Sequence, residues 1–295
     1  MMALIKRNIL VYTRDKVAFF MSFLSVIILV VLYQVFLGQL QLDAIKESMG
    51  TTTVSTDVVN MVNLWLISGL ITVVSLTGTL GAFSVMVLDK EKKLNEDFEI
   101  SSCPTWKLEL SYVIASVMLG TLITTLCFIF GVLMFNGFSY LLVFSLVDIV
   151  KILGLIVMSC FLSAAIVLPF LSFIKTSSAF STLSTIIGTL IGFLSGVYIA
   201  IGSVGDALAQ VMTWFPLTQV SALLKNILMS YSLQEVFAEA PKSTEDSYKV
   251  SYGLILRTMN DNEISSNQMI LYISICTIGL LMIYLIIKKG TKHGR

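Results

Sequence analysis

The chain has 295 residues, of which 56% are hydrophobic and only 13% are charged, and its formal net charge is +1. Its mean hydropathy of +0.91 lies far above that of soluble domains. This composition excludes an ordinary soluble protein and indicates one that spans a membrane several times.

Six stretches without a charged residue are long enough to cross a bilayer: 17–42, 58–88, 110–147, 152–174, 176–205 and 264–287. About 20 apolar residues in a helix span a hydrocarbon core, and backbone groups in lipid must be hydrogen-bonded within the segment. We therefore expect an all-α polytopic membrane protein in a single transmembrane domain, 1–295. The expected transmembrane helices cover about residues 17–37, 64–88, 110–135, 149–174, 177–203 and 266–287.

The basic residues are distributed unevenly between alternate loops. Thirteen of the 19 lie before span one, after spans two and four, or after span six, and six lie in the other loops. The positive-inside rule predicts that both termini are cytoplasmic. We expect the protein to lie in the cell membrane. A seventh uncharged stretch is 207–224. If it crossed the membrane, the basic C-terminal tail would lie outside the cell, so we expect this stretch to stay on the outer face.

The chain begins with an amphipathic segment, 3–16, which predicts an elbow helix lying on the inner leaflet. No cleavable signal sequence is expected, since the apolar run that follows is too long for one. Span two then carries hydroxyl groups at Ser68, Thr72 and Ser75. Close packing explains such residues, and the alternative is that they line a translocation path.

The cytoplasmic segment 89–109 is strongly charged and contains Leu94 and Phe98 at i and i+4, so a short helix would present both on one face. Pro104 ends that helix, because the residue before a proline avoids the α region. One interpretation is a surface helix at the headgroups. The other is a coupling segment that docks on a partner through Glu91, Leu94, Phe98 and Pro104.

Span five contains glycines at every fourth position, Gly188, Gly192 and Gly196, which predict a close helix contact or a dimer interface. It also carries many hydroxyl groups. We expect Ser181, Thr185 and Thr189 to line the translocation path together with those of span two.

The long outer region 205–263 starts with a sequence typical of two short helices hinged at a proline. Trp214, Phe215 and Pro216 mark the hinge, and Lys225 lies with Gln219 and Asn226 on the polar face of the second helix. The pattern predicts re-entrant helices in the outer interface, with Trp214 at headgroup level. A packing role is the alternative to contact with a substrate.

Residues for catalysis or metal binding are scarce. The single histidine is in the tail, and the four cysteines lie in spans or in the segment 89–109. We expect no enzyme, no cofactor or metal in this chain and no extracytoplasmic disulfide.

Together the elbow ending at residues 14–16, the segment closing in S-S-C-P at 101–104, and the run from Gly196 through the cluster 214–218 resemble the membrane subunit of type 2 ABC exporters. That family includes drug-resistance, haemolysin and polysaccharide export permeases. The glycine-lysine pair that often opens span three is absent, Lys225 stands where an arginine is frequent, and the segment 234–263 is longer than in compact members.

The resemblance implies a six-helix permease that forms a homodimer and works with two copies of a separate ATP-binding subunit, where ATP and Mg bind. The absence of a G-x-x-x-x-G-K-[ST] loop is consistent with that arrangement. The expected function is export of an amphiphilic small molecule, lipid-like compound, drug or toxin, with membrane lipids and no nucleic acid among its contacts. The alternatives are a carrier driven by an ion gradient and a membrane immunity or sensor protein.

Overall fold

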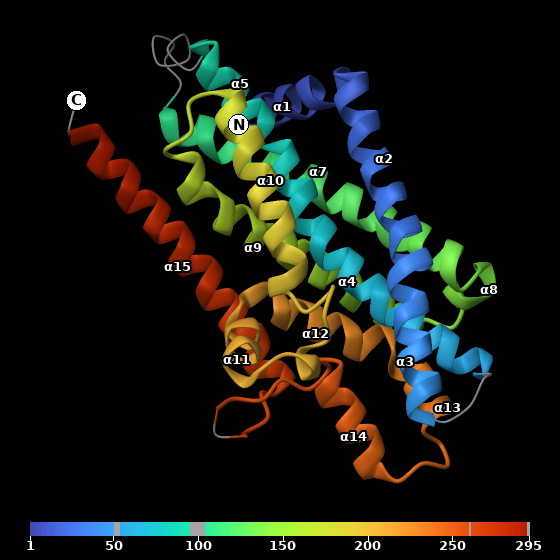
Figure 1. Cartoon of the computed structure of the whole chain (residues 1–295). Helices are drawn as coiled ribbons and strands as arrows, with labels where there is room; N and C mark the ends of the chain where they lie inside the picture. Colours follow the sequence, from blue (N-terminus) through green and yellow to red (C-terminus); the bar gives the residue numbers. More distant parts are fainter. Residues whose placement is uncertain (50–53, 95–103, 260, 294–295) are drawn as a thin grey trace.

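The structure is a computed structural model that describes residues 1–49, 54–94, 104–259 and 261–293 (Figure 1). In these residues the regular elements are helices, and the only β pairing is an isolated bridge between Arg257 and Glu263. In chain order the helices are α1 (Met2–Arg14), α2 (Lys16–Leu32), the π-helix η1 (Tyr33–Gly38), α3 (Gln39–Met49), α4 (Thr56–Ala82), α5 (Ser84–Glu91), α7 (Thr105–Phe135), α8 (Phe138–Leu141), α9 (Leu146–Leu171), α10 (Ser177–Leu194), the 3-10 helix η2 (Ile201–Ser203), α11 (Asp206–Trp214), α12 (Pro216–Leu228), α13 (Ser230–Val236), α14 (Lys242–Ser251) and α15 (Ser266–His293).

Six helical segments of the described chain are long and apolar enough to cross a membrane, which confirms the all-α polytopic fold. They are Val26–Asp43, Thr56–Glu91, Thr105–Phe135, Leu146–Leu171, Ser177–Leu194 and Ser266–Lys289. The pair α11 and α12 also passes the length and composition test, but the two helices are bent by 84° at Phe215, as in a broken span or a re-entrant loop.

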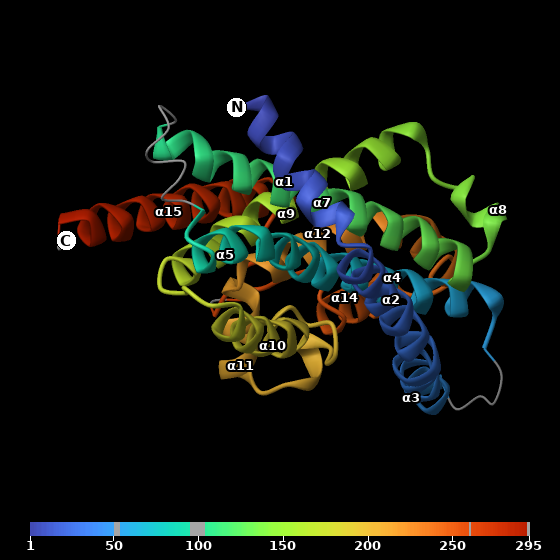
Figure 2. The ribbon, with the colours of Figure 1, turned by 90° about the horizontal axis from the view of Figure 1, so that it is seen from above.

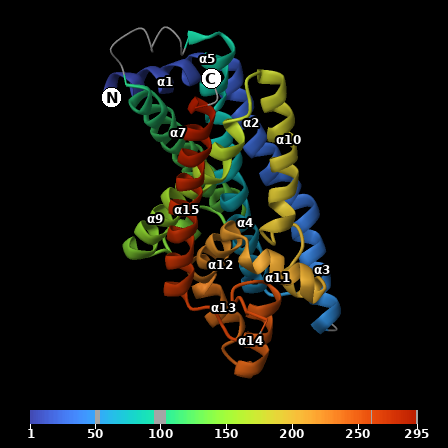
Figure 3. The ribbon, with the colours of Figure 1, turned by 90° about the vertical axis from the view of Figure 1, so that its left-hand side faces the viewer.

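The two chain ends lie at the same end of the helix bundle, which we call the terminus end, and α13 and α14 lie at the opposite, far end (Figures 1 and 3). α4 is the central helix and is buried along most of its length, with α7 and α10 on different sides of it (Figure 2). α10 and α15 lie at the periphery and remain mostly exposed.

Short polar side chains begin several of the long helices. The Ser55 and Thr176 hydroxyls accept hydrogen bonds from Val58 N (3.4 Å) and Ala179 N (3.3 Å) at the starts of α4 and α10. At the start of α9, Ser145 and Asp148 form a reciprocal capping box. These caps satisfy amide groups that a first helical turn leaves unpaired.

The helices α7 and α4 approach each other closely at Gly120 of α7. A Cβ atom built there would lie 2.2 Å from Thr79 Oγ1 and 3.1 Å from Thr79 Cα on α4. Because backbone atoms limit the space, this position requires glycine. Sequence analysis assigned the close contact to span five instead.

The glycines of span five have separate environments. A Cβ atom at Gly188 would lie 4.0 Å from Thr77 Cγ2 of α4, which is an ordinary contact distance. A Cβ atom at Gly192 would lie 2.0 Å from the ring of Tyr198, which follows α10 in the chain. Gly196 lies beyond the end of α10 and has a φ of +66°, so it is a turn residue. Within this chain the three glycines therefore do not form one helix contact, because α10 ends at Leu194 rather than near residue 203.

The helix α12 is buried in the bundle rather than lying on its outer surface. It packs on α4, α9 and α15, and Gln219 and Lys225 on its polar side are at most 1% exposed. Lys225 Nζ donates to Tyr252 O (3.0 Å) and lies 5.1 Å from the centre of the Trp65 ring, while Trp65 Nε1 donates to the same carbonyl (3.0 Å). The polar face expected for α12 is present, and the loop after α14 covers it.

The contact at Gly120 can be tested with a second glycine as control. We expect Gly120→Ala to lower the free energy of unfolding by about 1–3 kcal/mol, the usual cost of overpacking. In α9, a Cβ atom at Gly154 would meet nothing within 4 Å, so Gly154→Ala should be neutral or stabilising by about 0.4–1 kcal/mol. Thermal unfolding of both variants in detergent measures the difference, and equal midpoints would contradict the close contact.

Candidate coupling site at the flanks of segment 89–109

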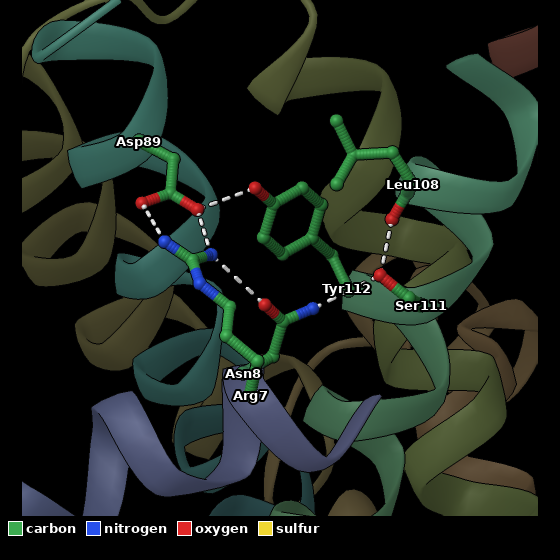
Figure 4. Close-up of polar contacts among 6 residues, drawn as sticks. All are labelled: Arg7, Asn8, Asp89, Leu108, Ser111 and Tyr112. Atoms are coloured by element: carbon green, nitrogen blue, oxygen red, sulfur yellow. Dashed lines mark hydrogen bonds and ion pairs between the residues drawn. The ribbon is translucent and has the colours of Figure 1, made fainter. Parts of the chain in front are cut away.

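The carboxylate of Asp89, near the end of α5, is buried and fully paired. Arg7 of the helix α1 donates to both of its oxygens, with a distance of 2.9 Å from Nη2 to Oδ1, and the Tyr112 hydroxyl of α7 donates to Oδ2 (Figure 4). Asp89 is 1% exposed. A buried carboxylate is tolerated only with such partners, and a bidentate arginine is the strongest of them.

A second contact extends this network along α1. Asn8 is 2% exposed, accepts from Arg7 Nη1 (3.1 Å) and donates to Ser111 Oγ (3.0 Å). Ser111 in turn donates to Leu108 O. The elbow helix is thereby hydrogen-bonded to α5 on one flank of segment 89–109 and to α7 on the other. Hydrogen bonding to Asp89 also raises the pKa of Arg7, so the guanidinium keeps its charge.

Other side chains connect the same flanks to the remaining helices. Lys90 Nζ donates to Leu171 O at the end of α9 (2.9 Å). Glu91 accepts from the Ser177 amide (3.2 Å) and hydroxyl at the start of α10. Lys288 of α15 forms an ion pair with Glu109 of α7. A displacement of segment 89–109 therefore acts on α1, α9, α10 and α15 together.

The structure places the predicted coupling residues as follows. Glu91 is exposed but bonded to Ser177, Leu94 is half-buried, and Pro104 precedes the first turn of α7 with a φ of −60°. Phe98 lies outside the described residues. Their contact with a partner subunit stays a prediction.

The hydroxyl groups predicted to line a path divide into two sets. Ser68, Thr72 and Ser75 of α4 are fully buried, and each donates to a carbonyl of its own helix. Ser75 also lies 2.6 Å from the Ser159 hydroxyl of α9. In the structure this set lies between packed helices, since α9, α10 and α12 all contact α4.

The second set lies on α10 and is exposed: Ser181, Thr185 and Thr189. Thr185 and Thr189 donate to the carbonyls four residues earlier, at 3.0 and 2.9 Å. These bonds satisfy the hydroxyl donors within the helix, so the face can lie in a membrane or against another chain. The translocation role of both sets stays a prediction.

The outer hinge lies where the sequence predicts it. Trp214 ends α11 and is 47% exposed, Phe215 is extended with a ψ of 120°, and Pro216 begins α12. The Tyr272 hydroxyl of α15 donates to Trp214 O (2.8 Å) and its ring lies 5.5 Å from that of Trp214.

Sequence reasoning missed the centre of the site, Arg7, Asp89 and Tyr112. Each is close to a predicted boundary between helix and loop, where charged residues are common, so none is unusual alone. The sequence did contain a signal for this pair. The predicted topology places the acidic residue at the end of span two and the arginine within the elbow at the same membrane surface, where opposite charges can meet.

The fold and these contacts define a multi-pass α-helical membrane protein whose helix ends are coupled at one surface. The sequence profile of the family described as "ABC-2 family transporter protein" matches residues 33–288. Because this match covers most of the chain, the protein belongs to that family and is a membrane component of a transporter. In the comparisons with curated proteins and with solved structures, nothing matches the chain.

The Arg7–Asp89 pair allows a direct test of how much the buried network stabilises the fold. Asp89→Ala leaves the partly buried guanidinium without its carboxylate, and removing one partner of a buried pair costs about 3–5 kcal/mol, reduced here to about 2–3 because Arg7 remains partly exposed. We expect a lower midpoint of thermal unfolding. Lys6→Ala removes an exposed neighbouring charge and should change it little. Similar losses in both variants would show that the buried pair has no special role.

Proposed function

We propose that the chain is the membrane-spanning subunit of an ATP-driven exporter that moves an amphiphilic small molecule, lipid-like compound, drug or toxin out of the cell. Membership of the ABC-2 family supports a permease. The observation that carries the proposal is the buried Arg7–Asp89–Tyr112 network, because it joins both flanks of segment 89–109 to the rest of the bundle. A force applied to that segment by a partner would reach the transmembrane helices.

The partners we propose are two copies of a separate subunit that binds ATP and Mg, and a second copy of this chain. Segment 89–109 meets the ATP-binding subunit. The exposed hydroxyl face of α10 supports the second contact, since a polar stripe on a peripheral transmembrane helix is better placed against another protein surface than in lipid. The path for the exported molecule then runs between the two copies.

We further propose that the terminus end faces the cytoplasm of a cell membrane and the far end faces outward. The excess of basic residues in the loops of the terminus end supports this orientation. Cysteine labelling tests it. In a background without native cysteines, Ser243→Cys in α14 should react with an impermeant thiol reagent added to whole cells, and Lys92→Cys should react only after permeabilisation. The reverse pattern would contradict the orientation.

The coupling proposal is tested by truncating two apolar side chains, Leu94→Ala together with Phe98→Ala. If both dock on the ATP-binding subunit, the double variant loses about 2–4 kcal/mol of apolar burial in that contact. We expect weaker co-purification with that subunit and less substrate-stimulated ATP hydrolysis, whereas the isolated ATPase keeps its basal rate.

The matched control is Lys92→Ala, which should change co-purification little, since an exposed charge contributes about 0–1 kcal/mol. Unaltered complex formation and transport in the double variant would show that segment 89–109 is a surface helix. Transport that follows an ion gradient without ATP would instead support the carrier.

A further inference from the structure

The far end of the bundle contains a cavity of about 610 Å³ between α11 and the loop that follows α14. Its apolar lining includes Ile201, Val204, Ala209 and Leu256. Volume and lining are those of small-molecule sites, which are largely apolar and contain a few polar groups. The same loop is fixed to the bundle by Trp65 and Lys225 through Tyr252 O, and by Asn226 Nδ2 through Leu254 O (2.8 Å).

One face of α11 supplies the polar groups of the cavity. Asp206, Gln210 and Thr213 all line it, at i, i+4 and i+7. Thr213 is 2% exposed. The Gln210 Oε1 atom is buried without a partner in the described parts of the chain, although Gln210 Nε2 donates to Arg257 O (3.3 Å).

The opposite wall contributes Arg257, whose Nε is also buried and unpaired. Its terminal nitrogens are already engaged with Asp261 and Glu263, both at 3.1 Å. The lining thus contains an unpaired acceptor on Gln210 and an unpaired donor on Arg257 beside an apolar space. Buried groups of this kind ordinarily have partners, so each one indicates a position for a polar atom of a ligand.

The charge around the cavity selects the kind of ligand. Asp206 and Asp261 line it, and an adjoining cavity of about 290 Å³ shares Arg257 and adds Asp246. Asp206 and Asp246 form no ion pair with any residue that the structure describes. The amino end of α11 contributes only about half a positive charge. Among the residues that line the larger cavity, two carboxylates, Asp206 and Asp261, face one guanidinium, Arg257, so the charge of the lining favours a cation.

We propose that this cavity binds a hydrophobic organic cation: an apolar body of drug size with an amine that donates to Gln210 Oε1 beside Asp206. Arg257 Nε donates to an oxygen or nitrogen acceptor next to the amine, and the apolar lining holds the body. The binding of such a compound is inferred from the cavity alone. Its identity with the exported molecule rests on the proposed function.

Two dyes with a common xanthene frame and opposite charge test the proposal, rhodamine 6G as the cation and fluorescein as the anion. Binding to the purified full chain is followed by fluorescence anisotropy, with empty detergent micelles as the blank. We expect saturable binding of rhodamine 6G, weaker at high salt, and no comparable binding of fluorescein. Equal binding of the two dyes would overturn the choice of a cation.

Variants then locate the site. Asp206→Asn keeps the shape and removes one charge, so the Kd for rhodamine 6G should rise about tenfold. Thr213→Val should raise it several-fold, and Ala209→Trp, which fills the cavity, should abolish binding. Glu239→Gln is the control, since Glu239 is exposed in the same region and does not line the cavity.

Unchanged affinity in Asp206→Asn and Thr213→Val would place the dye elsewhere, and an equal loss in Glu239→Gln would show only general surface charge. Should Ala209→Trp fail to fold, these two milder variants decide. The assay contains no ATP-binding subunit. A chain that binds the dye but has no ATPase partner would refute the proposed function alone, and one that couples to an ATPase without binding the dye would refute this site alone.

Discussion

The buried carboxylate of Asp89 is the constraint on which the terminus end of the bundle depends. A charge that is 1% exposed must be neutralised and hydrogen-bonded in place. Arg7 can reach it only if α1 lies across the ends of α5 and α7, and Tyr112 can reach it only if α7 starts beside α5. One charge therefore fixes the elbow helix and both flanks of segment 89–109. The contacts of Lys90, Glu91 and Glu109 with α9, α10 and α15 extend that arrangement to the other helices.

The central helix joins this site to the far end. α4 carries Trp65, which helps to hold the loop after α14, and continues through Phe83 into α5 with Asp89. Its contact with α7 at Gly120 is limited by backbone atoms, so the two helices cannot slide past one another without opening space. A tilt of α4 consequently changes the surroundings of Asp89 and the loop that borders the far cavity at once. α4 thus contacts both the proposed coupling site and the loop that borders the proposed ligand site.

Sequence patterns predicted the features that depend on local chemistry. Uninterrupted apolar stretches located the spans, and Pro216 located the bend, because lipid and the proline ring act on short segments. The Asp89 network joins residues about 80 positions apart, which no local pattern specifies. Likewise, a glycine in a helix does not indicate what occupies the space beside it. The ring of Tyr198 lies beside Gly192, whereas Thr79 of α4 lies beside Gly120. Helical periodicity assigned Lys225 correctly to a polar face. That the loop after α14 covers this face is seen only in the structure, where Lys225 donates to Tyr252 O.

That cover has a consequence for how the protein is made. Lys225 and Gln219 are buried in α12, and an ammonium group facing hydrocarbon alone is costly. The carbonyl that Lys225 requires belongs to Tyr252, 27 residues later in the chain. α12 leaves the ribosome before this acceptor does. The Lys225–Tyr252 contact therefore forms only after α14 and the following loop have emerged, so the burial of the polar face of α12 is completed after the helix itself has been made.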